Sequence, residues 1–275
     1  MKWNHQHWSK GQRAAMGLSV LACAMVVCAA ARVQAIPVGC TNEDLDNART
    51  LAVAAGAPAG AESESVPEEK VVYLTFDDGP SVVTETILDI LKEKGVPATF
   101  FVIAAENNAD DLPILARTVA EGHLVALHSA SHEYKQIYAS PEAYWADIEK
   151  LKEAISPYVP EPPKYLRFPG GSTNTVSRKY GGSEVMKRLK LQAEEKGYTY
   201  VDWNVCAEDA VGGHPSAQTI YNNVVREVGK QNTCVVLMHD TKAQKNTAAA
   251  LPDIIEWFKT AGYRFDTVDH LTKQI

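Results

Sequence analysis

The sequence predicts an α/β fold in which helices cover a mostly parallel sheet. Two observations predict it: short apolar runs with strand character alternate with segments of helical periodicity, and a glycine follows several of the helical segments. Strict alternation of strand and helix requires right-handed crossovers, and it builds either a closed barrel or a doubly wound sheet. The composition, 45% apolar and 22% charged, is that of a globular protein and excludes disordered, collagen-like and polytopic membrane classes.

Strands and helices are expected in strict alternation along the chain. The strands span residues 71–76, 98–103, 124–127, 165–168, 199–205, 234–238 and 263–267. The helices span residues 83–94, 112–121, 141–156, 183–196, 217–230 and 247–261. The glycines that favour a helix stop are Gly95, Gly122, Gly197 and Gly262.

The first 35 residues have the pattern of an export signal. They contain basic residues and no carboxylate, and an apolar run over residues 14–31 precedes a small-residue cleavage site at Val33-Gln34-Ala35. The run also approaches the length that spans a bilayer, so an uncleaved signal anchor is the alternative. Both hypotheses place the remaining chain outside the cytoplasm. Residues 36–70, rich in Ala, Gly, Pro, Ser and Glu, are expected to form a disordered linker before a folded domain over residues 71–275.

The charge and the cysteine content exclude further classes of protein. The net charge is −7, and the chain beyond the basic first segment is more acidic still. Nucleic acids and anionic membranes bind clustered Lys and Arg, so nucleic acid is excluded as a partner and a membrane is expected only through an N-terminal anchor. Five cysteines are too few for a disulfide scaffold. Cys206 and Cys234 lie at opposite ends of consecutive strands, so both are expected to be buried free thiols.

Ionisable residues collect where the expected strands end. In chain order they are Asp77-Asp78, His128 and His132, Arg167, Asp209, and His239-Asp240. In barrels and doubly wound sheets alike, the carboxyl ends of the strands meet at one face, where enzymes carry their chemistry. We therefore expect these side chains to form one site.

Each of these segments alone has a simpler interpretation. Asp77-Asp78-Gly79-Pro80 has the composition of a turn. His128 and His132 have metal-ligand spacing if their segment forms a helical turn, but chance also produces such pairs. His239 alone fits a hydrogen-bonded core residue. Taken jointly the simple interpretations fail, because each segment would have to fall at a strand end independently.

Five ordered segments resemble the motifs of the polysaccharide deacetylases, the metal-dependent carbohydrate esterases that share the chitooligosaccharide-deacetylase homology domain. They are Thr75–Pro80 (TFDDGP), His128–His132 (HSASH), Arg167–Gly171 (RFPGG), Asp209 and Leu237–His239 (LMH). The resemblance covers about residues 70–270. It implies a distorted (β/α) barrel with about seven parallel strands, which agrees with the strands expected from periodicity.

The resemblance implies a metal centre. Asp78, His128 and His132 match the ligands of one divalent ion, with Zn²⁺ favoured and Co²⁺, Mn²⁺ or Ni²⁺ as alternatives. Two imidazoles and one carboxylate leave a coordination position open, which is the catalytic and not the structural arrangement.

The resemblance also assigns groups around the metal. Asp77 matches the general base, and Arg167 matches the cation that positions it. Gly170 supplies a backbone N–H to the oxyanion, and Leu237 contacts the substrate.

The general acid implied by the resemblance is His239. Asp209 matches the carboxylate that orients this imidazole, and Asp202, within the expected fifth strand, is the alternative. Asp240 is expected to cap or support the site. One departure follows Asp209, where Ala210 replaces a tryptophan found in many relatives, so the wall around the acid or the acetyl pocket differs here.

The export signal and the resemblance to the polysaccharide deacetylases together predict an extracellular acetylated glycan as the substrate. N-acetylglucosamine of bacterial peptidoglycan is favoured, with chitooligosaccharides and O-acetylated xylan as alternatives, because no motif specifies the sugar. Two alternatives lie outside this activity: an inactive glycan-binding barrel, against which the intact triad argues, and a phosphoester hydrolase, which would need more cations at the strand ends than Arg167. The protein is expected to be a secreted or membrane-anchored monomer at the cell wall.

Overall fold

A computed structural model describes residues 69–272 and residue 275 of the chain. The predicted signal or anchor at residues 1–35 lies outside the described residues, and so does the predicted linker at 36–70 except for its last two residues. Within the ranges that the structure describes, no helix is both long enough and apolar enough to cross a membrane.

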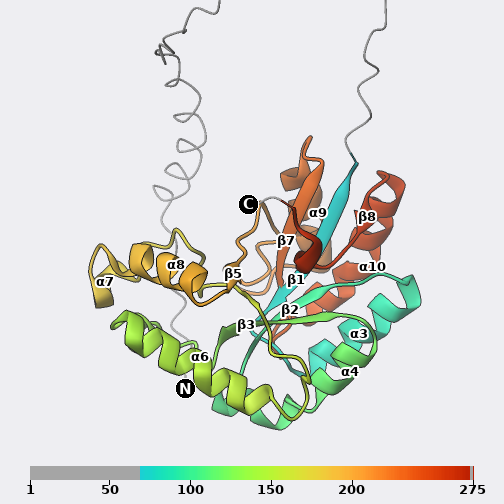
Figure 1. Ribbon diagram of the computed structural model, residues 1–275. Coiled ribbons are helices and arrows are strands. Elements are labelled where there is room, and N and C mark those ends of the chain that lie inside the picture. The colour runs from blue at the N-terminus through green and yellow to red at the C-terminus, as the bar shows by residue number, and fades with distance from the viewer. Residues whose placement is uncertain (1–68, 273–274) are drawn as a thin grey trace, which may run out of the picture. The chain divides into compact units, whose positions relative to one another are not determined.

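Strands and helices alternate along the described chain (Figure 1). The strands are β1 (Val71–Asp77), β2 (Thr99–Ile103), β3 (Leu124–Ser129), β4 (Tyr165–Leu166), β5 (Thr199–Tyr200), β6 (Val205–Cys206), β7 (Thr233–His239) and β8 (Arg264–Phe265). The α-helices are α3 (Val82–Lys94), α4 (Ile114–Ala120), α5 (Tyr134–Ile137), α6 (Pro141–Ile155), α7 (Arg178–Gly181), α8 (Val185–Glu195), α9 (Ala217–Val228) and α10 (Lys245–Thr260). The 3₁₀ helices are η1 (Glu106–Asp111) and η2 (Val268–His270).

The strands form one curled sheet, and every pairing among the described residues is parallel. Along the sheet the order is β5-β4-β3-β2-β1-β7-β6, and β8 pairs with the first residues of β1. Figure 1 shows the helices ranged around the outside of this sheet. The predicted distorted (β/α) barrel is confirmed.

The prediction of a single strand over residues 199–205 is wrong, because the chain forms two strands there. β5 pairs with β4 at one end of the sheet, and β6 pairs with β7 at the other. Residues 201–204, which we call the seam, connect the two ends. Arg167 donates from Nε to the Val201 carbonyl and from Nη2 to the Asp202 carbonyl, both at 3.0 Å. A buried side chain thus satisfies carbonyls that a neighbouring strand would otherwise pair.

The four long strands, β1, β2, β3 and β7, are buried on both faces, which explains their nearly continuous apolar sequences. In β1, Val72 and Leu74 pack against the helices, whereas Val71 and Tyr73 join a smaller cluster inside the barrel. Because side chains alternate between the two faces of a strand, the same alternation directs Asp77 into the interior at the carboxyl end of β1.

Serine side chains cap several helices at their first turn. Ser81 accepts a hydrogen bond from Val83 N and forms a capping box with Thr84 at the start of α3. Ser140 and Ser216 cap α6 and α9 with their hydroxyl groups. The predicted helix-stop glycines all have positive φ, between 65° and 85°, which confirms those helix ends.

Cys206 and Cys234 are both free thiols, as predicted, but only Cys234 is buried, and Cys206 is partly exposed. Burial raises the pKa of Cys206 to about 12 and that of Cys234 to about 11. Both thiols therefore stay protonated and unreactive at neutral pH.

Candidate active site

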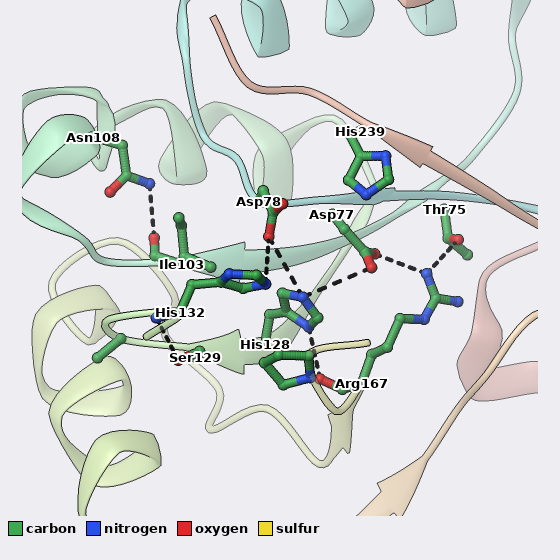
Figure 2. A network of polar contacts seen from close by, with 12 residues as sticks. Thr75, Asp77, Asp78, Ile103, Asn108, His128, Ser129, His132, Arg167 and His239 are labelled. Atoms are coloured by element: carbon green, nitrogen blue, oxygen red, sulfur yellow. Dashed lines mark hydrogen bonds and ion pairs between the residues drawn. The ribbon is translucent and has the colours of Figure 1, made fainter. Parts of the chain in front are cut away.

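Six of the predicted site residues lie together at the carboxyl ends of the strands (Figure 2): Asp77, Asp78, His128, His132, Arg167 and His239. β1 and β7 are paired along their whole length, and their register places Asp77 directly opposite His239. His128 belongs to the end of β3, and Arg167 follows β4. The parallel sheet thus brings together groups that are far apart in the chain, as its topology requires.

Asp77 is held by a fully buried arginine. Nη1 of Arg167 donates to Oδ1 of Asp77 and to the Thr75 hydroxyl, each at 2.8 Å. The guanidinium also lies over the Phe101 ring, 4.1 Å from its centre. Burial raises the pKa of Asp77 above its usual range, and the charge of Arg167 opposes this rise. A fixed carboxylate of raised basicity has the properties of a general base.

Asp78, His128 and His132 form a group that fits a divalent metal ion. One ligand atom from each residue lies within 4.8 Å of the other two. Oδ1 of Asp78 is buried and accepts no hydrogen bond from the described residues. It lies 3.5 Å from Nε2 of His128 and 3.4 Å from Nε2 of His132. A buried carboxylate oxygen without a partner is unfavourable unless a cation satisfies it, so this atom supports the fit.

The backbone sets the tautomer of His128. Its Nδ1 lies 2.7 Å from the Arg167 carbonyl, which can only accept, so Nδ1 carries the proton and Nε2 keeps its lone pair. Burial lowers the pKa of His128 to about 3, and the ring is therefore neutral near pH 7. A neutral imidazole with a free Nε2 is the form that ligates a metal.

The segment between the two histidines does not form the helical turn that would suit their spacing. His128 lies in β3, and His132 follows a bend at Ala130 and Ser131 and has a φ of 53°. The Ser129 hydroxyl accepts a hydrogen bond from His132 N at 2.8 Å and donates to Oδ2 of Asp147 at 2.6 Å. Asp147, on α6, also accepts from the next two backbone N–H groups, at 2.7 and 3.1 Å. This buried carboxylate fixes the bend that returns His132 toward His128.

Asp147→Asn is expected to weaken Zn²⁺ binding by about 10–100-fold, the usual effect of removing a group that orients metal ligands. An amide cannot accept all three hydrogen bonds, so the bend would loosen and hold His132 less firmly, although the three ligand residues themselves are unchanged. Calorimetric titration with Zn²⁺ measures the Kd, and Glu149→Gln, an exposed carboxylate on the same helix, is the control. Equal Kd values for the two variants would contradict the role of Asp147.

His239 pairs with Asp209. Nδ1 of His239 lies 2.8 Å from Oδ1 of Asp209, and the backbone N–H of His239 donates to Oδ2 at 2.8 Å. Burial alone would lower the pKa of His239, but the charge and hydrogen bond of Asp209, with the other carboxylates of the site, raise it to about 10. The imidazole is therefore protonated at neutral pH and can give up a proton.

Asp202, the alternative partner for His239, lies in the seam and binds elsewhere. Its carboxylate accepts hydrogen bonds from the Ser172 N–H at 2.9 Å and from the Ser172 hydroxyl at 2.6 Å. Its carbonyl accepts from Arg167. Asp202 therefore ties the loop after β4 to the seam.

Asp240 ties the end of β7 to the start of α3. Its Oδ2 accepts from the Thr84 hydroxyl and its carbonyl from the Ser81 hydroxyl, both at 2.5 Å. The carboxylate lies against Gly79, where any side chain would collide with it. Burial raises the pKa of Asp240 to about 7. The turn that carries Asp78 is thereby fixed from the β7 side.

Gly170 and Leu237 occupy the loop after β4 and the interior face of β7. Gly170 lies in a turn closed by a 2.7 Å hydrogen bond from Gly171 N to the Phe168 carbonyl, and no described residue accepts a hydrogen bond from the Gly170 N–H. Leu237 precedes His239 by two residues in β7, so the two side chains share the interior face. The fold thus leaves a free backbone donor after β4 and an apolar side chain on the face that carries the imidazole.

Sequence reasoning missed Tyr134 and Asp147. Tyr134 begins α5 two residues after His132, and its ring packs edge-on against that imidazole, with centres 5.6 Å apart. Asp147 lies on the buried face of α6 with Ile148 and Leu151. An acidic residue at a buried helical position is a signal that the periodicity itself contains.

Comparison with known proteins identifies relatives of this chain. The family model described as polysaccharide deacetylase matches residues 64–193. The peptidoglycan-N-acetylglucosamine deacetylase of Bacillus cereus is 33% identical over 204 residues, which cover 72% of this chain and 69% of the relative. A bifunctional xylanase/deacetylase of Pseudobutyrivibrio xylanivorans is 30% identical over 203 residues, covering 74% of this chain and 30% of the relative.

The fold has a solved counterpart as well. The crystal structure of the catalytic domain of peptidoglycan N-acetylglucosamine deacetylase from Eubacterium rectale matches with a TM-score of 0.71 and 36% identity. The match covers 81% of this chain and 96% of that domain. Sequence, fold and site agree, and the chain therefore belongs to the polysaccharide deacetylase family of hydrolases.

Proposed function

We propose that the protein removes the acetyl group from N-acetylglucosamine residues of peptidoglycan, outside the cytoplasm. The register of β1 and β7 carries this proposal, because it sets Asp77 opposite His239 with the Asp78–His128–His132 group beside them. Amide hydrolysis needs both a base and an acid, since the attacking water loses a proton and the leaving amine gains one.

Asp78, His128 and His132 would hold the metal, with Zn²⁺ favoured by two imidazoles and one carboxylate and Co²⁺, Mn²⁺ or Ni²⁺ as alternatives. When bound, such an ion polarises the acetyl oxygen and lowers the pKa of water. The buried, unpaired Oδ1 of Asp78 supports this assignment.

The other groups move protons and bind developing charge. Asp77, oriented by Arg167, takes a proton from the attacking water. His239, kept protonated by Asp209, gives a proton to the leaving amine. The free N–H of Gly170 donates to the oxygen that becomes negatively charged. Leu237, on the same face as the imidazole, would contact the acetyl methyl group.

The alkaline fall in activity is expected to report His239, because only the protonated imidazole serves as an acid. Asp209 raises the pKa of His239. Asp209→Asn should therefore lower that pKa and move the alkaline limb of kcat/KM down by about one pH unit or more. Asp202→Asn is the control, because Asp202 contacts Ser172 instead. An alkaline limb that stays in place in Asp209→Asn would contradict the pairing.

The substrate proposal follows the names of the relatives. Those from B. cereus and E. rectale are named for N-acetylglucosamine of peptidoglycan, which favours that sugar here. The P. xylanivorans relative is named a xylanase/deacetylase, so O-acetylated xylan is the second candidate. A phosphoester is disfavoured because Arg167 is fully buried and already pairs with Asp77.

The test uses the full chain loaded with Zn²⁺ and incubated with peptidoglycan, chitooligosaccharides and acetylated xylan. Acetate and new free amines are quantified, and mass spectrometry of digested products locates the lost acetyl group. We expect amines on the glucosamine of peptidoglycan with the wild type and far fewer with Asp77→Asn. Acetate from xylan without any new amine would replace the proposal with O-deacetylation, and no acetate from any glycan would overturn it.

The proposed location is the outside of the cytoplasmic membrane, where peptidoglycan lies. Residues 1–35 would act as a signal peptide or anchor, residues 36–70 as a linker, and residues 71–275 as a monomeric catalytic domain. The basic start and the apolar run over residues 14–31 support export.

A further inference from the structure

The side chain of Tyr134 reaches the candidate active site from α5. Its ring packs edge-on against His132 on one side, with centres 5.6 Å apart, and against Tyr138 on the other, at 5.5 Å. Its hydroxyl lies beside the Cα of Gly170, because a Cβ placed on that glycine would be 2.5 Å from the hydroxyl oxygen. The Tyr134 side chain therefore bridges the metal-ligating group and the turn that carries the free N–H.

The Tyr134 hydroxyl has no hydrogen-bond partner among residues 69–272, although the ring is half-buried. The hydroxyl of the adjacent Tyr138, in contrast, is paired: this fully buried side chain donates a hydrogen bond to the Pro169 carbonyl at 2.7 Å. Tyr138 thus supports the turn, and Tyr134 approaches the same turn with an unused donor. A phenol that the fold places but does not pair is available to a ligand.

We propose that the Tyr134 hydroxyl donates a hydrogen bond to the acetyl oxygen of the substrate, as a second donor beside the Gly170 N–H. The proposal rests on the deacetylase function proposed above. Both donors belong to one corner of the site, next to the group that would hold the metal.

The movement of electrons during the reaction shows at which step the hydrogen bond from Tyr134 to the acetyl oxygen is strongest. As the water oxygen bonds to the acetyl carbon, the C=O π pair moves onto the acetyl oxygen, which becomes an anion. That pair returns when the C–N bond breaks, and the nitrogen leaves with the bonding electrons and takes a proton from His239. Tyr134 keeps its own proton throughout. Its hydrogen bond is stronger to the anion than to the neutral carbonyl, so it lowers the barrier.

The proposal also explains the glycine at position 170. Gly170 has a φ of 79°, and the space where its side chain would lie is taken by the Tyr134 hydroxyl. Another residue there would displace the hydroxyl and strain the backbone. The two donors can lie side by side because one of them comes from a residue without a side chain.

Tyr134→Phe removes only the hydroxyl and keeps the ring against His132. We expect kcat for acetate release to fall about 10²-fold, as for the loss of one oxyanion donor. KM, Zn²⁺ content and the limbs of the pH profile should stay unchanged. Tyr165→Phe is the matched control, because Tyr165 is the first residue of β4 and its hydroxyl donates to the Asp269 carbonyl instead of facing the candidate site.

Each alternative outcome is distinguishable. A raised KM with unchanged kcat would show that the hydroxyl binds the ground state and the transition state equally. Lost Zn²⁺ would show that it positions His132, and either result overturns the proposal. Equal kcat in the wild type and Tyr134→Phe overturns it while the deacetylase function stands. Wild-type protein that releases no acetate from any of the glycans overturns both.

A stability measurement tests the position of the hydroxyl without using activity. In the wild type, the methyl group of Gly170→Ala would collide with the Tyr134 hydroxyl, whereas in Tyr134→Phe the nearest ring carbon lies 3.4 Å from it. The backbone strain at φ of 79° is common to both backgrounds. Gly170→Ala should therefore lower Tm less in the Tyr134→Phe protein, and equal losses would contradict the placement.

Discussion

Replacing Asp77 with asparagine is expected to lower kcat by about 10²–10⁴-fold while the protein keeps its metal, the loss typical of a positioned general base. Asp77 and Asp78 are adjacent but point to different partners. Oδ1 of Asp77 is bonded to Arg167, and its Oδ2 lies 3.9 Å from Nε2 of His128. Oδ1 of Asp78, in contrast, lies within 3.5 Å of a nitrogen from each histidine. Asparagine fits the same space as Asp77 but cannot take up a proton.

The matched variant is Asp78→Ala, which should lose both metal and activity, as should His128→Ala and His132→Ala. Elemental analysis for zinc and acetate release would be compared for the purified proteins. Asp77→Asn losing its metal while Asp78→Ala keeps it would reverse the two roles. Metal and activity retained in both variants would contradict the mechanism itself.

Arg167→Met is expected to lower the free energy of unfolding by about 3–5 kcal/mol, as when one partner of a buried ion pair is removed. Arg167 is fully buried, and its guanidinium binds the Asp77 carboxylate and two carbonyls of the seam. Methionine fills much of the volume but leaves a buried carboxylate without its cation and two carbonyls unpaired. Activity should be lost as well, because Asp77 loses its orientation.

Urea unfolding followed by circular dichroism measures the free energy of unfolding of Arg167→Met. Two further variants identify which lost interaction lowers it. Arg117→Met, which removes surface ion pairs with Asp89 and Glu121, should change stability little. The double variant Asp77→Asn/Arg167→Met should be more stable than Arg167→Met, because the uncompensated charge is gone. Equal stability of the single and double variants would show that the carbonyls of the seam, and not Asp77, require the cation.

The sequence predicts the helices and most strands well because local signals define them, but it could not predict the seam. Residues 199–205 are rich in the β-branched and aromatic types that favour a strand. The break depends on distant partners. Oδ1 of Asn204 accepts from Val235 N at 2.7 Å, and its Nδ2 donates to the Thr233 carbonyl at 2.8 Å. A side chain thus replaces part of the ladder, and no local pattern reveals that.

In the candidate site, too, the sequence could predict some features and not others. Asp77, His128 and His239 could be recognised because each lies at the end of a strand or one residue before it and belongs to a recognisable motif. The bend at His132 could not, since a spacing of four residues suits a helical turn equally well. Its conformation is decided by the contacts of Asp147 from another helix, which only the packed structure reveals.

The seam also determines how little free strand edge the protein presents. β5 and β6, at the two ends of the sheet, are only two residues long, and the seam joins them covalently. An unpaired edge is a template on which a second chain can add a strand, and very short edge strands are one way in which proteins prevent this. In the described part of the chain, the open barrel therefore offers a second copy little backbone to pair with.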